Sequence, residues 1–260
     1  MFPLTKKLRT GLRVLAGKGP GAVWPLLADK AMRVSRSRPG GLVRLEGCVF
    51  RSEADLRPWL LNGEYEGAER FAGKRYIRRD IPVVEFGGSM GVVSCLLNRR
   101  LTNPADHVVV EANPQILPTL FENRNRNHCN FEIVHGAAGG VGESVRIYIG
   151  ENALSSSASA TERESVEVPA LRLADILESR GFRRCALMCD IEGSEIQMIR
   201  AEMETLRSRV EVFIVEFHPG ISGLETVEEA RLLLKDQGFA EVWHQHDVFV
   251  YRNSALTNPA

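Results

Sequence analysis

From residue 81 to the end of the chain, short apolar runs alternate with longer stretches of helical character, and this alternation restricts the fold more than any other feature. Each apolar run is almost continuous over four residues, which is typical of strands buried on both faces. The runs lie at residues 83–86, 108–111, 131–134, 186–189 and 212–215. Helical patterning occupies residues 90–101, 114–126, 171–180, 194–206 and 225–237. Alternating strands and helices predict an α/β fold, with a parallel sheet covered by helices on both faces.

Other segments predict shorter elements around this core. Alternation of apolar and polar residues indicates strands that are buried on one face. We expect a local hairpin from residues 143–149 and 165–169, a final strand pair from residues 241–243 and 248–251, a short strand pair within residues 42–50, and a helical stretch over residues 53–79.

The charge distribution sets the first part of the chain apart. Residues 1–40 contain nine basic residues against one acid, although the 260-residue chain has no net charge. We predict three parts: a basic extension at residues 1–60 that includes two short helices, a catalytic α/β domain at 61–253 and a tail at 254–260. Zero net charge gives no reason to expect nucleic acid as a partner. A basic arm predicts peripheral membrane contact through residues 1–40, with a solvated arm as the alternative.

The cysteines and the first residues favour the cytoplasm. The five cysteines are odd in number and lack the Cys-x-x-Cys spacing of zinc sites. Residues 1–30 lack the unbroken apolar stretch of a signal peptide, because glycine and proline interrupt them. We therefore expect free thiols in a reducing compartment, whereas the oligomeric state stays open.

The first apolar run leads into a glycine-rich loop that begins with an acid. Residues 85–91 read Glu-Phe-Gly-Gly-Ser-Met-Gly. Gly87, Gly88 and Gly91 allow a sharp turn and a close approach of a ligand to the backbone. The spacing differs from the G-x-G-x-x-G of dinucleotide sites, and the Glu85 carboxylate would attract a cation and repel a pyrophosphate. We predict that Glu85, Gly87, Gly88 and Gly91 hold a cationic cofactor; a structural turn is the alternative.

The second apolar run ends in Glu111-Ala112-Asn113-Pro114. An acid at this strand end, just over twenty residues after the glycine loop, can accept hydrogen bonds from ribose hydroxyls. Asn113 and Pro114 suit the cap and first turn of the next helix, which explains them without a ligand. Capping does not explain the acid, so we predict that Glu111 and Ala112 bind the cofactor.

Acids and one histidine follow the last two apolar runs. Residues 190–195 read Asp-Ile-Glu-Gly-Ser-Glu, and residues 216–218 read Glu-Phe-His. Ligands of open α/β sheets bind outside the carboxyl ends of the strands. We predict Asp190, Glu216 and His218 as catalytic residues, with Asp190 between cofactor and acceptor, His218 as general base and Glu216 as its orienting partner. A divalent metal on these three side chains is an alternative that we do not predict; helix capping is another.

In this order, the motifs resemble those of the FkbM family of S-adenosylmethionine-dependent methyltransferases over about residues 60–250. The matching elements are Tyr65-Glu66, residues 85–91, residues 110–114, residues 190–195 and Glu216. The acidic block at residues 190–195 is the most specific, because common class I methyltransferases lack it. The chain departs from the family pattern in having Glu85 for Asp, Gly88-Ser89 for Ala-Asn, and Met188 for Lys.

The resemblance implies a Rossmann-like class I methyltransferase fold, with a mostly parallel seven-stranded sheet, an antiparallel final strand pair and an N-terminal helical extension. It implies S-adenosylmethionine as cofactor and O-methylation of a hydroxyl on a sugar, glycan or natural product. The acceptor would be read by residues 1–60 and 150–165. Two alternatives stay open: an NAD- or nucleotide-sugar-dependent oxidoreductase, and a catalytically degenerate methyltransferase fold that acts as a binding module.

Overall fold

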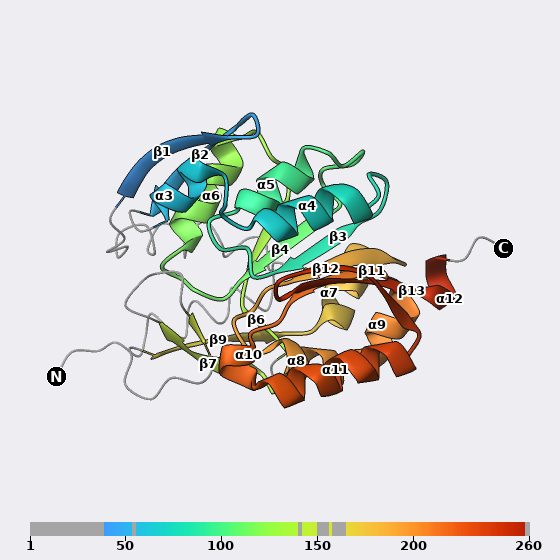
Figure 1. Ribbon diagram of the computed structural model, residues 1–260. Coiled ribbons are helices and arrows are strands. Elements are labelled where there is room, and N and C mark those ends of the chain that lie inside the picture. Colours follow the sequence, from blue (N-terminus) through green and yellow to red (C-terminus); the bar gives the residue numbers. More distant parts are fainter. Residues whose placement is uncertain (1–38, 54–55, 140–141, 150–155, 158–164, 258–260) are drawn as a thin grey trace.

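The computed structural model describes residues 39–53, 56–139, 142–149, 156–157 and 165–257. Its centre is a seven-stranded sheet with the order β12-β13-β11-β10-β3-β4-β5 (Figure 1). The strands are β3 (Val83–Phe86), β4 (His107–Glu111), β5 (Glu132–His135), β10 (Cys185–Cys189), β11 (Val210–Glu216), β12 (Phe239–Gln245) and β13 (Val248–Asn253). β13 runs antiparallel to both neighbours, and the other pairs are parallel. The predicted α/β fold, with its mostly parallel sheet and antiparallel final pair, is confirmed.

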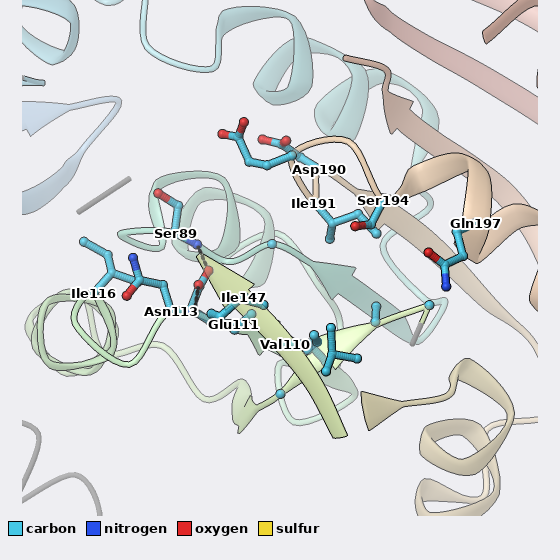
Figure 2. Close-up of a pocket in the computed structure, with 18 of the residues that line it drawn as sticks. Ser89, Val110, Glu111, Asn113, Ile116, Ile147, Asp190, Ile191, Ser194 and Gln197 are labelled. Carbon is cyan, nitrogen blue, oxygen red and sulfur yellow. Dashed lines mark hydrogen bonds between the residues drawn. The ribbon is translucent and has the colours of Figure 1, made fainter. Parts of the chain in front are cut away.

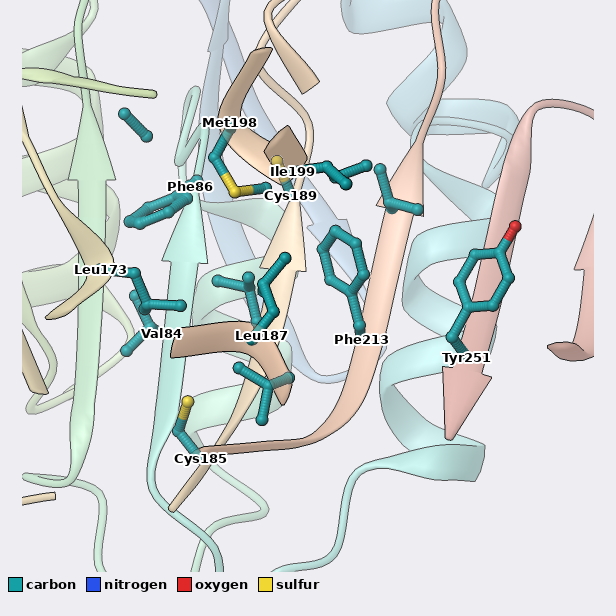
Figure 3. Packing of buried hydrophobic residues seen from close by; sticks show 14 of the residues in the cluster. Val84, Phe86, Leu173, Cys185, Leu187, Cys189, Met198, Ile199, Phe213 and Tyr251 are labelled. Atoms are coloured by element: carbon teal, nitrogen blue, oxygen red, sulfur yellow. The ribbon is translucent and has the colours of Figure 1, made fainter. Parts of the chain in front are cut away.

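Helices cover both faces of the sheet (Figure 1). One face carries α4 (Gly67–Tyr76), α5 (Val92–Asn98) and α6 (Leu117–Arg126), and the other carries α7 (Leu173–Arg180), α8 (Glu195–Ala201), α9 (Met203–Arg209) and α11 (Leu224–Asp236). Neighbouring residues of one strand point to opposite faces. Val83 accordingly packs in the same cluster as the α4 and α5 residues, whereas Val84 packs with Leu173 and Met198 (Figure 3).

The helical segment predicted at residues 194–206 is divided in two at Glu202. The side chain of Glu202 is buried, and its Oε1 accepts a hydrogen bond from the backbone N–H of Leu173 at 2.8 Å. The first N–H groups of a helix lack partners within the helix. The break between α8 and α9 therefore directs a carboxylate to the first turn of α7.

A second, smaller sheet follows β5 along the chain. It has the order β6-β9-β7-β8 and consists of β6 (Ala137–Ala138), β7 (Ser144–Ile149), β8 (Ser156–Ser157) and β9 (Ser165–Leu171). β7 pairs antiparallel with β9, as predicted for a hairpin at residues 143–149 and 165–169. The side chains of Ile147 and Val168 are buried in a cluster of their own with Ala137. This insertion thus carries a small apolar core beside the main sheet.

The strand pair expected within residues 42–50 is confirmed as β1 (Pro39–Leu45) and β2 (Cys48–Glu53), which are antiparallel. The side-chain amides of Asn123 in α6 and of Asn127, the residue directly after α6, bind the edge of β2. Asn123 accepts from the N–H of Arg51 at 2.6 Å and donates to its carbonyl at 2.9 Å, and Asn127 does the same with Val49 at 2.8 and 3.0 Å. The two amides replace the neighbouring strand that β2 lacks on this side.

The helical stretch expected over residues 53–79 consists of two helices, α3 (Arg57–Asn62) and α4. The chain turns between them because Gly63 has φ 73° and Glu66 has φ 48°, both left-handed. Two short helices complete the described chain, α10 (Pro219–Ser222) and α12 (Ser254–Thr257). Residues 1–38, with the predicted helices of the basic arm, lie outside the described residues. No helix in the described part of the chain is long and apolar enough to cross a membrane.

Candidate active site

A cavity of about 470 Å³ lies at the carboxyl ends of β3, β4 and β10 (Figure 2). Its volume falls within the range of about 300–1,000 Å³ that is usual for small-molecule sites. The walls come from the loops after β3 and β10, the end of β4, residues 136–139 and part of β7. This is the edge of an open α/β sheet at which ligands bind. The three predicted motif regions therefore converge on one cavity.

Glu111 is fixed at the floor of the cavity by backbone donors. Its Oε2 accepts from the N–H of Ser89 at 2.7 Å, and its Oε1 accepts from the N–H of Asn113 at 2.6 Å (Figure 2). Burial raises the pKa of Glu111 to about 6, although these hydrogen bonds act in the opposite direction. Glu111 and Ala112 both line the cavity, as predicted. A carboxylate oriented in this way is suited to accept further hydrogen bonds from hydroxyl groups.

The three glycines of the loop after β3 serve different purposes. Gly87 lines the cavity with φ 89°, and a Cβ atom there would lie 1.6 Å from the carbonyl oxygen of Asp190. Gly88 and Gly91 are not among the lining residues. A Cβ atom on them would lie 2.4 Å from a methyl group of Val109 and 2.5 Å from one of Leu120, respectively. Gly87 shapes the cavity itself, whereas Gly88 and Gly91 allow the loop to pack on β4 and α6.

The structure corrects the predicted position of Glu85. Its buried carboxylate accepts a hydrogen bond from Ser94 Oγ at 2.8 Å and lies 3.2 Å from His107 Nε2, and it is not among the residues that line the cavity. Both faces of β3 are covered by helices, so a side chain in mid-strand points into one helix layer rather than to the strand end. Glu85 therefore contributes to the buried contact between β3, α5 and β4.

Asp190 follows β10 and lines the cavity (Figure 2). Its Oδ1 is fully shielded from solvent and has no hydrogen-bond partner among the described residues. Burial and the charges of Glu192, Glu66 and Glu69 raise the pKa of Asp190 well above its usual range. Burial raises the pKa of Glu66, also at the cavity wall, in the same way. An oxygen without a partner in this position is available to a ligand.

His218 lies behind Asp190 and is oriented by Glu195. Its Nδ1 is 3.0 Å from Glu195 Oε1, and its Nε2 is 3.6 Å from both Asp190 Oδ1 and Glu192 Oε2. Burial lowers the pKa of the imidazole, but Glu195, Glu192 and Glu216 outweigh it and raise the pKa to about 9. The free imidazole is therefore protonated at neutral pH, in contrast to the value near 6.5 expected of an unperturbed base.

Glu216, the predicted orienting partner, does not take that position. It ends β11, and burial, the charge of Asp190 and a hydrogen bond with Glu69 raise its pKa to about 10. Neither Glu216 nor His218 is among the residues that line the cavity. Glu195 takes the partner's place because the turn after β10 brings its fully buried carboxylate to Nδ1 of the imidazole.

Sequence reasoning assigned no role to several residues of the cavity. Ser89, which belongs to the glycine loop but had no assigned role, and the β7 residues Val145 and Ile147, which no motif marks, line the cavity. Tyr65, which hydrogen-bonds to Ser89 Oγ at 3.1 Å, and Glu66 matched the family pattern but had no assigned function. Glu66, Ser89 and Glu192 have φ values of 48°, 46° and 53°, respectively. Left-handed backbone in residues other than glycine is strained and is concentrated at functional sites.

Comparisons with known proteins agree with this arrangement. The sequence profile described as the methyltransferase FkbM domain matches residues 86–240, from the end of β3 into β12. No curated protein matches the sequence.

Three of the solved structures that match this chain are distant from it in sequence. The Methanococcus jannaschii fibrillarin pre-rRNA processing protein is 10% identical, with a TM-score of 0.47 over 84% of this chain and 86% of its own. The O-methyltransferase TomG from Streptomyces achromogenes, in complex with SAM, is 14% identical, with a TM-score of 0.43 over 70% and 75%. Precorrin-6y C5,15-methyltransferase from Geobacter metallireducens is 15% identical, with a TM-score of 0.43 over 71% and 87%.

The profile covers more than half of the chain, and its match includes the glycine loop, Glu111, the acidic block after β10 and the end of β11. The chain therefore belongs to the methyltransferase FkbM family.

Proposed function

We propose that this methyltransferase transfers the methyl group of S-adenosylmethionine to a hydroxyl oxygen of a sugar, glycan or natural product. The observation that carries this proposal is the acidic lining of the cavity. Four carboxylic acids line it, and none of the described lining residues is Lys, Arg or His. The four are Glu66, Glu111, Asp190 and Glu192.

An acidic cavity discriminates between the two cofactors that a Rossmann-like sheet commonly binds. S-adenosylmethionine carries an ammonium and a sulfonium group, which nearby carboxylates attract, whereas the pyrophosphate of NAD is repelled by them. A dinucleotide site also uses a G-x-G-x-x-G loop, which the loop at residues 85–91 does not match. The charge and the loop together favour S-adenosylmethionine over the oxidoreductase alternative.

The residues of the cavity fit this cofactor. Glu111, held by two backbone N–H groups, would accept hydrogen bonds from the ribose hydroxyls. Gly87 leaves the backbone open to a close approach. Asp190, with its unpartnered Oδ1, would accept a hydrogen bond from the acceptor hydroxyl between the cofactor and His218.

In the transfer itself, the acceptor oxygen forms a bond to the methyl carbon as the bond between that carbon and sulfur breaks. The cofactor leaves as the neutral sulfide, and the hydroxyl proton must pass to a base. His218 is the proposed base, oriented by Glu195 through Nδ1. Because its pKa is raised to about 9, it has to lose its own proton before it can take one. Close alignment of oxygen, carbon and sulfur then contributes to the acceleration.

Binding and turnover measurements test this proposal in sequence. Isothermal titration of the full chain should show binding of S-adenosylmethionine and S-adenosylhomocysteine but not of NAD. A screen of sugars, glycans and natural products with a methyl-labelled cofactor should then find labelled acceptor. NAD binding in place of the adenosyl ligands would overturn the proposal. Cofactor binding without label on any hydroxyl acceptor would favour a catalytically degenerate binding module.

We also propose a cytoplasmic location and peripheral contact of residues 1–40 with anionic lipid. Five free cysteines support the former, and the basic charge of the arm supports the latter. Deletion of the arm should remove salt-sensitive binding to anionic vesicles and leave cofactor binding intact. Equal vesicle binding with and without the arm would contradict the membrane role.

A further inference from the structure

Three side chains at the edge of the cavity bring atoms that can bind a metal ion close together. Asp190, Glu192 and His218 each offer one atom that a metal ion can bind, and these atoms all lie within 4.8 Å of one another. His218 Nε2 is 3.6 Å from Asp190 Oδ1 and 3.6 Å from Glu192 Oε2. These distances are too long for hydrogen bonds. Two ligand atoms that each lie about 2.0–2.2 Å from a shared ion, with an angle of about 90–110° at the ion, are about 2.8–3.6 Å apart.

Two buried oxygen atoms without partners provide a separate observation. Asp190 Oδ1, the atom that faces His218, is shielded from solvent and has no hydrogen-bond partner among the described residues. The same holds for Oε2 of Glu195, whose side chain is 0% exposed. Buried polar atoms are normally paired. A cation beside Asp190 Oδ1 would satisfy that oxygen.

Glu195 holds the three side chains in this arrangement. Its Oε1 accepts from the N–H groups of Ile191 and Gly193, at 3.1 and 3.0 Å, and contacts His218 Nδ1 at 3.0 Å. The first two contacts shape the loop that carries Asp190 and Glu192. The third directs Nε2 toward those two carboxylates. Metal-binding histidines in proteins are commonly oriented through their other ring nitrogen by a buried carboxylate.

We propose that Asp190, Glu192 and His218 bind one divalent transition-metal ion, of the Mn²⁺ or Zn²⁺ type. A set with one imidazole and two carboxylates suits such ions better than Mg²⁺ or Ca²⁺, which prefer oxygen ligands alone. Six acids, Glu66, Glu69, Asp190, Glu192, Glu195 and Glu216, influence one another or His218 in this region. An ion with two positive charges would stabilise the ionised forms of the two acids that bind it, Asp190 and Glu192.

Three protein ligands leave at least one position on the ion free, as in catalytic metal sites. Asp190 and Glu192 also line the cavity, so the free position can face the acceptor. This consequence rests on the proposed function: the ion lowers the pKa of the acceptor hydroxyl. Its proton leaves to water, which reaches the site because Glu192 is 38% exposed. The oxygen then takes the methyl group as the carbon–sulfur bond breaks. His218 Nε2 is a ligand in this state and no longer a base.

The test is a Mn²⁺ titration of chelator-treated full-length protein, followed by the electron paramagnetic resonance signal of free Mn²⁺. We expect one ion per chain, displaced by Zn²⁺. Glu195→Gln should weaken binding about 10–100-fold, as is usual for residues that orient a ligand, and Asp190→Asn and His218→Ala should weaken it at least as much. Glu192→Gln, at the exposed side of the site, provides a ligand variant that does not disturb a buried position.

His244→Ala is the matched control, because His244 also contacts a carboxylate, that of Glu241 at 2.9 Å, but is 59% exposed and lies outside the three-residue group. It should bind Mn²⁺ as the unchanged protein does.

Thermal melting and S-adenosylhomocysteine binding are measured on every sample. No Mn²⁺ binding by a folded protein that binds S-adenosylhomocysteine would overturn the metal site alone. Equal Mn²⁺ affinity in Glu192→Gln, His218→Ala and the unchanged protein would also overturn it. If the unchanged protein does not bind S-adenosylhomocysteine, the proposed function is overturned instead.

Discussion

The two ends of the central sheet both carry clusters of ionisable side chains, but the clusters differ in how far their acids are paired with bases. At the amino ends of the strands, Arg78 pairs with Asp80 at 3.0 Å and with Glu211 at 3.3 Å, and Arg184 lies 3.5 Å from Glu211. At the carboxyl ends, Asp190 Oδ1 has no partner among the described residues. Acids and bases alternate at the first edge, whereas acids outnumber the single histidine at the second.

This difference distinguishes ion pairs that contribute to stability from acidic groups that are available to a ligand. Pairs at the amino ends satisfy one another, so that they need no ligand and contribute modestly to stability. An excess of one charge inside a cavity is unfavourable in the free protein, and a ligand of opposite charge relieves it. We therefore expect ligand binding at the carboxyl-end cluster rather than at the arginine-containing amino-end cluster.

The largest expected effect is that of Asp190→Asn. Asp190 is proposed to position the acceptor hydroxyl and to bind the metal ion, so loss of this carboxylate should lower methyl-transfer turnover about 100–10,000-fold, the range typical of disabled general acid–base catalysis. The matched change at the opposite edge, Asp80→Asn, should leave turnover unchanged, because Asp80 is exposed and contacts Arg78. Initial rates with labelled cofactor measure both. Similar rates for the two variants would remove the contrast between the edges.

Glu111→Ala should weaken the binding of S-adenosylhomocysteine. Two hydrogen bonds from the ribose to a charged group would be lost, each worth about 1.5–3 kcal/mol. Glu132→Ala is the control, since Glu132 lies on the next strand and contacts Arg180 rather than the cavity. Isothermal titration gives both affinities. Unchanged affinity of the Glu111 variant would exclude this residue from the ribose site.

Cofactor affinity should also depend on pH. Because burial raises the pKa of Glu111 to about 6, the carboxylate gains a proton as the pH falls through that value, and its capacity to accept hydrogen bonds decreases. Affinity for S-adenosylhomocysteine should therefore fall by up to about tenfold per pH unit below 6. Glu111→Gln, which has no titrating group, should make the profile flatter. A wild-type profile that is flat between pH 5 and 8 would contradict this assignment.

The smallest effect is expected at the amino-end edge. Arg184→Ala removes an exposed arginine from Glu211, so the free energy of unfolding in urea should fall by only about 0–1 kcal/mol. Methyl-transfer turnover should not change. A larger loss of turnover than of stability would show that this edge also takes part in function, and would break the comparison.

The main elements of the fold could be predicted because the sheet is covered on both faces. Each buried strand appears as an apolar run, and the structure places β3 and β4 within a residue or so of the predicted positions. The burial of β3 on both faces also explains why the predicted position of Glu85 was wrong. In a strand with no polar face, the sequence does not show to which side an acid points, and here it points toward Ser94 and His107.

The site could be predicted in its location but not in its contacts. Strand-end motifs indicate the edge of the sheet, and Glu111 and Asp190 are found there. The partner of His218 depends on the path of the loop after β10, where Glu192 adopts φ 53°. No sequence pattern specifies a left-handed conformation in a glutamate. Glu195, 23 positions away from His218 in the sequence, therefore could not be distinguished from Glu216 as its partner.

The contact between Gly87 and Asp190 has a mechanical consequence. The site for a missing Cβ atom on Gly87 lies 1.6 Å from the Asp190 carbonyl oxygen, and the N–H of Asp190 bonds to the carbonyl of Phe86 at 2.9 Å. The loop that faces the proposed cofactor and the loop that carries Asp190 thus rest directly on each other's backbone. A displacement of one, when a ligand enters or leaves, has no compressible side chain to absorb it and is passed to the other. Occupancy on the Gly87 side would in this way be transmitted to the position of Asp190.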